Sequence, residues 1–144
     1  MMSIEVKGID DVKKILEDIA PKRATNLITA TMRGVATEIK KEIQNTVTIR
    51  TANLKRSVKV KKSRGDKFKP TFKVVFDQGK SAKHDGFYWR FEEHGTSRGQ
   101  KATNFVRKSR LKIEANLGFI IRKQFTKKLE SAIKREMKRQ AASK

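Results

Sequence analysis

Cysteine is absent from the 144-residue sequence, and proline and histidine occur only twice each. The lack of cysteine excludes disulfides and thiolate chemistry. His84 and His94 do not form a pair on one helical face, and neither has the His/Asp/Ser spacing that metal or acid–base sites use. We therefore expect a protein that is not an enzyme, with no catalytic residues, no cofactor and no metal. His94 is interpreted as a solvated side chain.

Long apolar runs are also missing. No stretch approaches the roughly 18 apolar residues of a membrane span, and the first residues lack the apolar core of a signal peptide. We expect synthesis in the cytoplasm and no membrane association. Residues 1–144 are predicted to form a single domain, since this length suits one hydrophobic core.

Acidic residues are scarce, with 15 Asp and Glu against 36 Lys and Arg, for a net charge of +21. The excess is concentrated in residues 50–73, with ten basic residues and one acidic residue, and in residues 98–144, with fifteen and three. Such a distribution favours a polyanion or an acidic protein as partner. The basic residues expected to face a partner or DNA are Lys59, Lys61, Lys62, Arg64, Arg98, Lys101, Arg107 and Lys108.

Sequence-specific reading of bases is not supported, because few exposed aromatics accompany these clusters and no helix-turn-helix or RNP-like motif occurs. The clusters could neutralise phosphates without reading sequence. A solvated basic surface that only keeps the protein soluble is the other interpretation. Glycine-rich phosphate loops of the Walker or dinucleotide type are absent.

Apolar periodicity predicts a long helix from about Thr25 to Val47, with one stripe facing a core. That stripe consists of Ile28, Met32, Val35, Ala36, Ile39, Ile43 and Val47. A short strand in residues 1–8 and a short helix ending at Pro21 should precede it. Alternating β-branched and aromatic residues predict strands at 57–61 and 71–76, joined by an exposed basic hairpin around 61–70. A polar loop should follow over residues 78–86.

The C-terminal part should form a longer helix from beyond Phe105, weakened at Gly118 and frayed at its end. Together these elements predict an α+β fold. A small, mainly antiparallel sheet packs against the long helix, with short N-terminal and longer C-terminal helices.

The stretch from Phe87 to Arg107 opens with four aromatics in five residues. It is interpreted as a strand with Phe87 and Trp89 packed in the core, followed by a tight turn at Gly95. Consecutive strand residues point to opposite sides, so Glu92 and Glu93 are expected to pair with nearby basic groups rather than act on one reacting centre. A loop held this way at the rim of a sheet is suited to contact a partner.

Three sequence blocks resemble one protein family. Residues 50–58, RTANLKRSV, look like an R-T-G-x-L-[RK]-x-S-[IV] segment that follows the long helix. Residues 88–105 resemble an aromatic strand, an E-x-G-T-S turn and an A-x-P-F segment, and residues 6–10 resemble a V-x-G-[IL]-D opening. Ala52 and Asn104 stand where the family has Gly and Pro. The order of blocks is similar to the small head–tail joining proteins of long-tailed double-stranded DNA phages, the gene-product-ten-like family.

This resemblance implies a structural virion protein of the neck or tail-completion type, located at the head–tail connection. It implies a homo-oligomeric ring that contacts adjacent head-completion or connector proteins and tail proteins, with DNA passing non-specifically through its lumen. Residues expected at a subunit or ring boundary are Phe91, Glu92, Glu93, Gly95, Thr96, Ser97 and Phe105. The alternative from another class is a monomeric, basic nucleic-acid-binding protein. A toxin-like nuclease is disfavoured because no acid–base pair or metal cluster is apparent.

Overall fold

The computed structural model describes residues 21–47, 52–64 and 70–143. Its elements are helices α2 (Pro21–Thr46), α3 (Ala52–Ser57), α4 (Trp89–His94) and α5 (Phe105–Ala142), with strands β1 (Val58–Lys62) and β2 (Phe72–Phe76). The N-terminal strand and helix expected before residue 21, and most of the hairpin loop, lie outside the described residues. The α+β fold class is confirmed.

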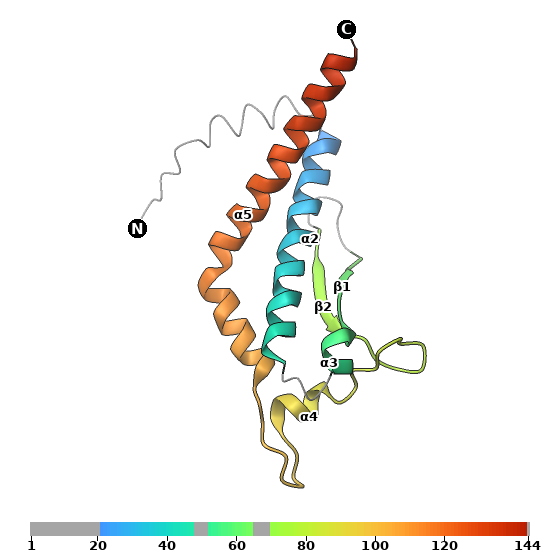
Figure 1. The fold of residues 1–144 in the computed structure, drawn as a ribbon, viewed down its shortest axis with the longest axis vertical. Helices are drawn as coiled ribbons and strands as arrows, with labels where there is room; N and C mark the ends of the chain where they lie inside the picture. The colour runs from blue at the N-terminus through green and yellow to red at the C-terminus, as the bar shows by residue number, and fades with distance from the viewer. Residues whose placement is uncertain (1–20, 48–51, 65–69, 144) are drawn as a thin grey trace.

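Two long helices form the frame of the molecule and run alongside one another (Figure 1). Their directions are opposed, because Arg23 near the start of α2 pairs with Glu136 near the end of α5 at 2.6 Å. Near the other end, Lys112 pairs with Glu42 at 2.8 Å. The prediction of a long helix is therefore confirmed, and α5 runs without interruption through Gly118.

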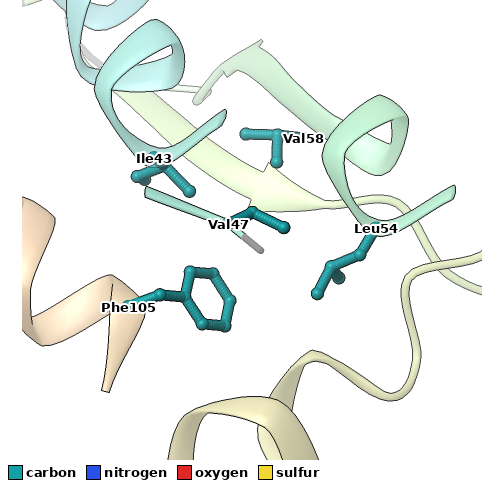
Figure 2. Close-up of a cluster of buried hydrophobic side chains, with 5 residues drawn as sticks. All are labelled: Ile43, Val47, Leu54, Val58 and Phe105. Carbon is teal, nitrogen blue, oxygen red and sulfur yellow. The ribbon is translucent and has the colours of Figure 1, made fainter. Parts of the chain in front are cut away.

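The antiparallel pair β1–β2 packs against α2, as its sequence alternation predicted. Val58 faces Phe76 across the pair, and Lys62 faces Phe72 at the other end. The hydrophobic core consists of side chains from α2 and the residue after it, from α3, from β1 and from the start of α5 (Figure 2). Its buried members are Ile43, Val47, Leu54, Val58 and Phe105.

The first turns of α2 differ from the predicted buried stripe. Ile28 is 44% exposed and Met32 37% exposed, whereas Val35 is buried. The sheet ends near this point, since the guanidinium of Arg33 lies over the ring of Phe72, the first residue of β2, at 5.9 Å. The strands therefore cover the apolar face of α2 only from about Arg33 onward.

The aromatic stretch is helical, so its assignment to a strand is wrong. The amide of Glu92 donates to the carbonyl of Tyr88, and the amide of Gly95 donates to that of Phe91, as in a helical turn. Within the described residues the sheet has only two strands, so no edge pairs with this segment. Trp89 nevertheless packs on the core, stacked on Phe76 with ring centroids 5.0 Å apart. Phe87, expected in the core, is 59% exposed.

Candidate functional site

The α4 surface, which comprises α4, the two residues before it and the loop 95–104, lies at one end of the molecule (Figure 1). It contains a pocket of about 390 Å³ between the helix and the loop. The pocket is lined by Tyr88, Phe91, Glu92, Thr96, Ser97, Arg98 and Gln100. Four of the residues expected at a subunit boundary, Phe91, Glu92, Thr96 and Ser97, are thus brought together.

Two exposed phenylalanines belong to this surface: Phe91 lines the pocket, and Phe87 contacts Tyr88, which also lines it. Phe87 is 59% exposed and Phe91 49% exposed. The ring of Phe87 also meets Tyr88 edge-on, with centroids 5.5 Å apart. Large apolar side chains left in water near a concave surface are a common feature of protein interaction sites. The α4 surface is therefore a candidate docking surface.

The loop after α4 is held in one shape by its own hydrogen bonds. The amide of Thr96 donates to the carbonyl of Gln100 at 3.0 Å, and Gln100 Nε2 donates to Glu92 Oε1 at 2.9 Å. The amide and hydroxyl of Thr103 both donate to the carbonyl of Glu92, at 2.9 and 2.7 Å. A partner would therefore meet a largely preformed surface.

Gly95 makes the predicted tight turn. Its φ of +76° is in a region that favours glycine. A Cβ at this position would lie 2.6 Å from the carbonyl oxygen of Gln100 and 2.9 Å from the amide nitrogen of Ala102. Both atoms belong to backbone, so neither can move aside without deforming the loop. Gly95 therefore shapes the α4 surface rather than presenting a side chain on it.

Glu93 has a structural role that the sequence did not reveal. Its side chain is only 5% exposed. Its two carboxylate oxygens accept hydrogen bonds from the amides of Val106 at 2.8 Å and Arg107 at 3.1 Å. These amides belong to the first turn of α5, which lacks helical partners and favours a negative charge. Instead of the expected ion pair with a basic side chain, Glu93 thus caps α5 and ties α4 to it.

Phe105 is also inside the molecule rather than at its surface. It is 2% exposed and meets Phe76 edge-on, with centroids 5.9 Å apart. It therefore anchors one end of the loop, whereas half-exposed Phe91 lies on the pocket wall. Any contribution of Glu93 or Phe105 to a subunit boundary would act through the loop that they hold.

The basic residues expected to face a partner form two groups: those that pair with a carboxylate in the described part of the chain and those that do not. Lys59 and Lys61 both pair with Asp77, at 3.4 Å for Lys61. The hydrogen bond from Lys59, with help from Lys61, lowers the pKa of Asp77 below its ordinary value of 3.8. The exposed residues with no carboxylate partner among the described residues are Lys62, Arg64, Arg98, Lys101, Arg107 and Lys108.

A second concave surface was missed by the sequence analysis. This basic groove, of about 560 Å³, lies between α2, α5 and the end of β1. Its cations are Arg33, Lys41, Lys62, Lys127 and Lys128. Only Lys62 was among the expected partner-facing residues. The signal in the sequence was weak, because the five positions are separated by up to 95 residues and converge only in the fold.

Neither a metal site nor a membrane-spanning helix is found in the described ranges. No group of three or more His, Asp or Glu side chains there is arranged to hold a metal ion. None of the helices in that part of the chain is long and apolar enough to cross a membrane.

Comparison with known proteins identifies the family. Neither a curated protein nor a solved structure matches the chain. A family model described as "Bacteriophage HK97-gp10, putative tail-component" matches residues 9–95, more than half of the chain. The matched stretch includes α2, the β-hairpin and α4, and it ends at Gly95, so α5 lies beyond it. The chain therefore belongs to the HK97 gp10-like family of phage tail components, in agreement with the resemblance noted in its sequence.

Proposed function

We propose that this protein completes the head–tail connection of a long-tailed phage, as a homo-oligomeric ring that docks the tail to the DNA-filled capsid. Membership of a phage tail-component family supports a structural role in the virion. The observation that carries the finer proposal is the α4 surface, with two exposed phenylalanines beside a preformed pocket. Its chemistry is that of protein binding, with no catalytic step.

Aromatic side chains are favoured anchors at protein interfaces, where they fill pockets on the partner. Phe87 and Phe91 provide such anchors, and the adjacent pocket can receive an apolar side chain in return. A ring needs contacts in which one patch of each subunit meets a different patch of the next. A projecting aromatic pair and a neighbouring pocket satisfy this requirement better than one flat, self-complementary face.

The boundary residues proposed at the surface of the ring subunit are Phe91, Glu92, Gly95, Thr96 and Ser97, with Glu93 and Phe105 holding them in place. Arg98 and Lys101 lie on the same loop, and Arg107 and Lys108 lie at the start of α5. All four are exposed, and they would favour acidic faces on the neighbouring connector or tail proteins.

A monomeric nucleic-acid-binding protein remains the second candidate, supported by the net charge of +21 and the basic groove. The two candidates differ in oligomeric state and location. A ring of fixed stoichiometry in purified particles supports the first proposal. Tight DNA binding by a monomer that is absent from particles supports the second.

The docking proposal is tested by replacing Phe87 and Phe91 together by serine in the phage. Both side chains are about half exposed or more, so the purified double variant should unfold within about 1 kcal/mol of the wild type. Infectious titre should fall by at least about tenfold if the pair contributes 1.4 kcal/mol or more to docking. Filled heads and unattached tails should accumulate.

A matched control replaces Leu111 and Phe119 by serine. These residues are 60% and 69% exposed on α5 and lie outside the α4 surface and the family match. This control should join heads to tails normally. The docking assignment is wrong if the Phe87 and Phe91 variant folds and gives the same titre as the control.

A further inference from the structure

The basic groove gathers its cations from three elements. Arg33 and Lys41 come from α2, Lys62 from the end of β1, and Lys127 and Lys128 from α5. Figure 1 shows α2 between α5 and the hairpin, the two neighbours that supply the other lining residues. Five cations thus line one concavity of about 560 Å³.

The negative charge within the groove is small and already used. Among the described residues that line the groove, Glu38 is the only carboxylate. It lies 3.7 Å from Lys41 Nζ and accepts a hydrogen bond from Gln124 Nε2 at 3.2 Å. Lys62, Lys127 and Lys128 have no carboxylate within ion-pair distance among the described residues. The groove therefore presents an uncompensated positive charge.

The floor of the groove is fixed by close contact between the helices. A Cβ on Gly34 would lie 2.4 Å from Gln124 Oε1. Gly34 thus lets the side chain of Gln124, which is 7% exposed, lie directly against α2. Because α2 and α5 are in close contact at Gly34 and Gln124, the backbone positions that carry the groove's cations are fixed relative to one another.

The rest of the lining is polar and small. It consists of Asn26, Thr29, Ala30, Gly34, Thr37 and Gln124. The hydroxyls of Thr29 and Thr37 donate to carbonyls within α2, at 2.8 and 2.9 Å, so the lysines and Arg33 supply the donors for a ligand. None of the described residues that line the groove has a large apolar or aromatic side chain, although protein interfaces usually depend on such anchors. Lysine, arginine and small polar groups are the usual partners of phosphate oxygens.

We infer that the basic groove binds the phosphate backbone of nucleic acid without reading its sequence. This inference deepens the proposed function, because it names the residues that would contact DNA at the head–tail connection. Each lysine in contact with a phosphate releases a condensed counterion, so the affinity falls steeply as salt rises. For this purpose the groove offers Lys62, Lys127 and Lys128, which have no carboxylate partner in the described part of the chain.

The test measures fluorescence anisotropy of a labelled DNA duplex of about 20 base pairs with the purified full-length protein over a range of salt concentrations. The test variant carries Lys62→Ala, Lys127→Ala and Lys128→Ala. Its charge-matched control carries Lys80→Ala, Lys83→Ala and Lys134→Ala, which are exposed lysines outside the groove. Both variants lose three positive charges, so a difference between them reports location rather than net charge.

We expect the groove variant to bind duplex DNA at least tenfold more weakly than the control near 0.1 M salt. The plot of log affinity against log salt concentration should become less steep, its slope decreasing in magnitude by about 2 to 3. This follows from a slope of about 0.9 per phosphate contact and the loss of up to three contacts. Equal affinities and slopes for the two variants would overturn the inference. It is also overturned if the groove variant loses binding only to poly-glutamate, since the groove would then be a site for an acidic protein.

Particle assembly separates this inference from the proposed function. The groove inference fails alone if the phage requires the gene to join heads to tails while the two lysine variants bind DNA equally. The proposed function fails alone if the groove variant loses DNA binding but interruption of the gene leaves virions intact.

Discussion

Replacing Phe105 by alanine should lower the free energy of unfolding by about 3 to 5 kcal/mol. Phe105 is 2% exposed and belongs to the buried cluster in Figure 2, where α5 begins beside the end of α2 and the sheet. Truncation removes the edge-on contact with Phe76 and leaves a cavity that rigid neighbours cannot fill. Urea denaturation followed by the fluorescence of Trp89, the single tryptophan, measures the loss.

Phe91→Ala is the matched control for this prediction. Both phenylalanines flank the loop after α4, but Phe91 is 49% exposed and lies on the pocket wall. Its truncation should cost less than about 1 kcal/mol. Similar losses of stability in the two variants would contradict the assignment of Phe105 to the core and Phe91 to the surface.

Replacing Glu93 by alanine should destabilise the protein by about 2 to 3 kcal/mol. The change leaves the amides of Val106 and Arg107 without their acceptor in a partly buried site. It also removes a negative charge from the N-terminal end of α5, where the helix dipole favours one. The loop 95–104 should lose order with it, which amide hydrogen exchange measures.

Two neighbouring variants make this prediction specific. Glu92→Ala removes one side-chain hydrogen bond, to Gln100, on the exposed side of α4, and should cost less than about 1 kcal/mol. Glu93→Gln keeps one oxygen acceptor in the same place, so its stability should fall between that of the wild type and Glu93→Ala. The capping role is refuted if Glu92→Ala costs as much as Glu93→Ala.

Periodicity was sufficient to predict α2 and the hairpin because each buries an apolar face over much of its length. It failed for the aromatic stretch, where alternating Phe87, Trp89 and Phe91 suited a strand. A strand needs a neighbouring edge to satisfy its backbone, and the local sequence does not show whether one is available. In the fold Phe87 lies in a turn before the short helix α4, which contains Trp89 and Phe91; Trp89 stacks on Phe76, whereas Phe87 and Phe91 are left in water.

The candidate sites also differ in whether their residues are close together or far apart in the sequence. Residues adjacent in sequence, such as Glu92, Thr96 and Ser97, lie near one another because a single turn at Gly95 joins them. The cap made by Glu93 depends on amides thirteen and fourteen residues away. The basic groove depends on the antiparallel placement of α2 and α5. Such long-range arrangements follow from tertiary packing, and a single sequence does not display them.

Electron microscopy of particles made by a phage with this gene interrupted tests the proposed role most directly. We expect filled heads to accumulate beside separate, finished tails, because the ring that joins them would be missing. Complementation with the wild-type gene should restore joined particles. Intact, infectious virions from the interrupted phage would contradict a role at the head–tail connection.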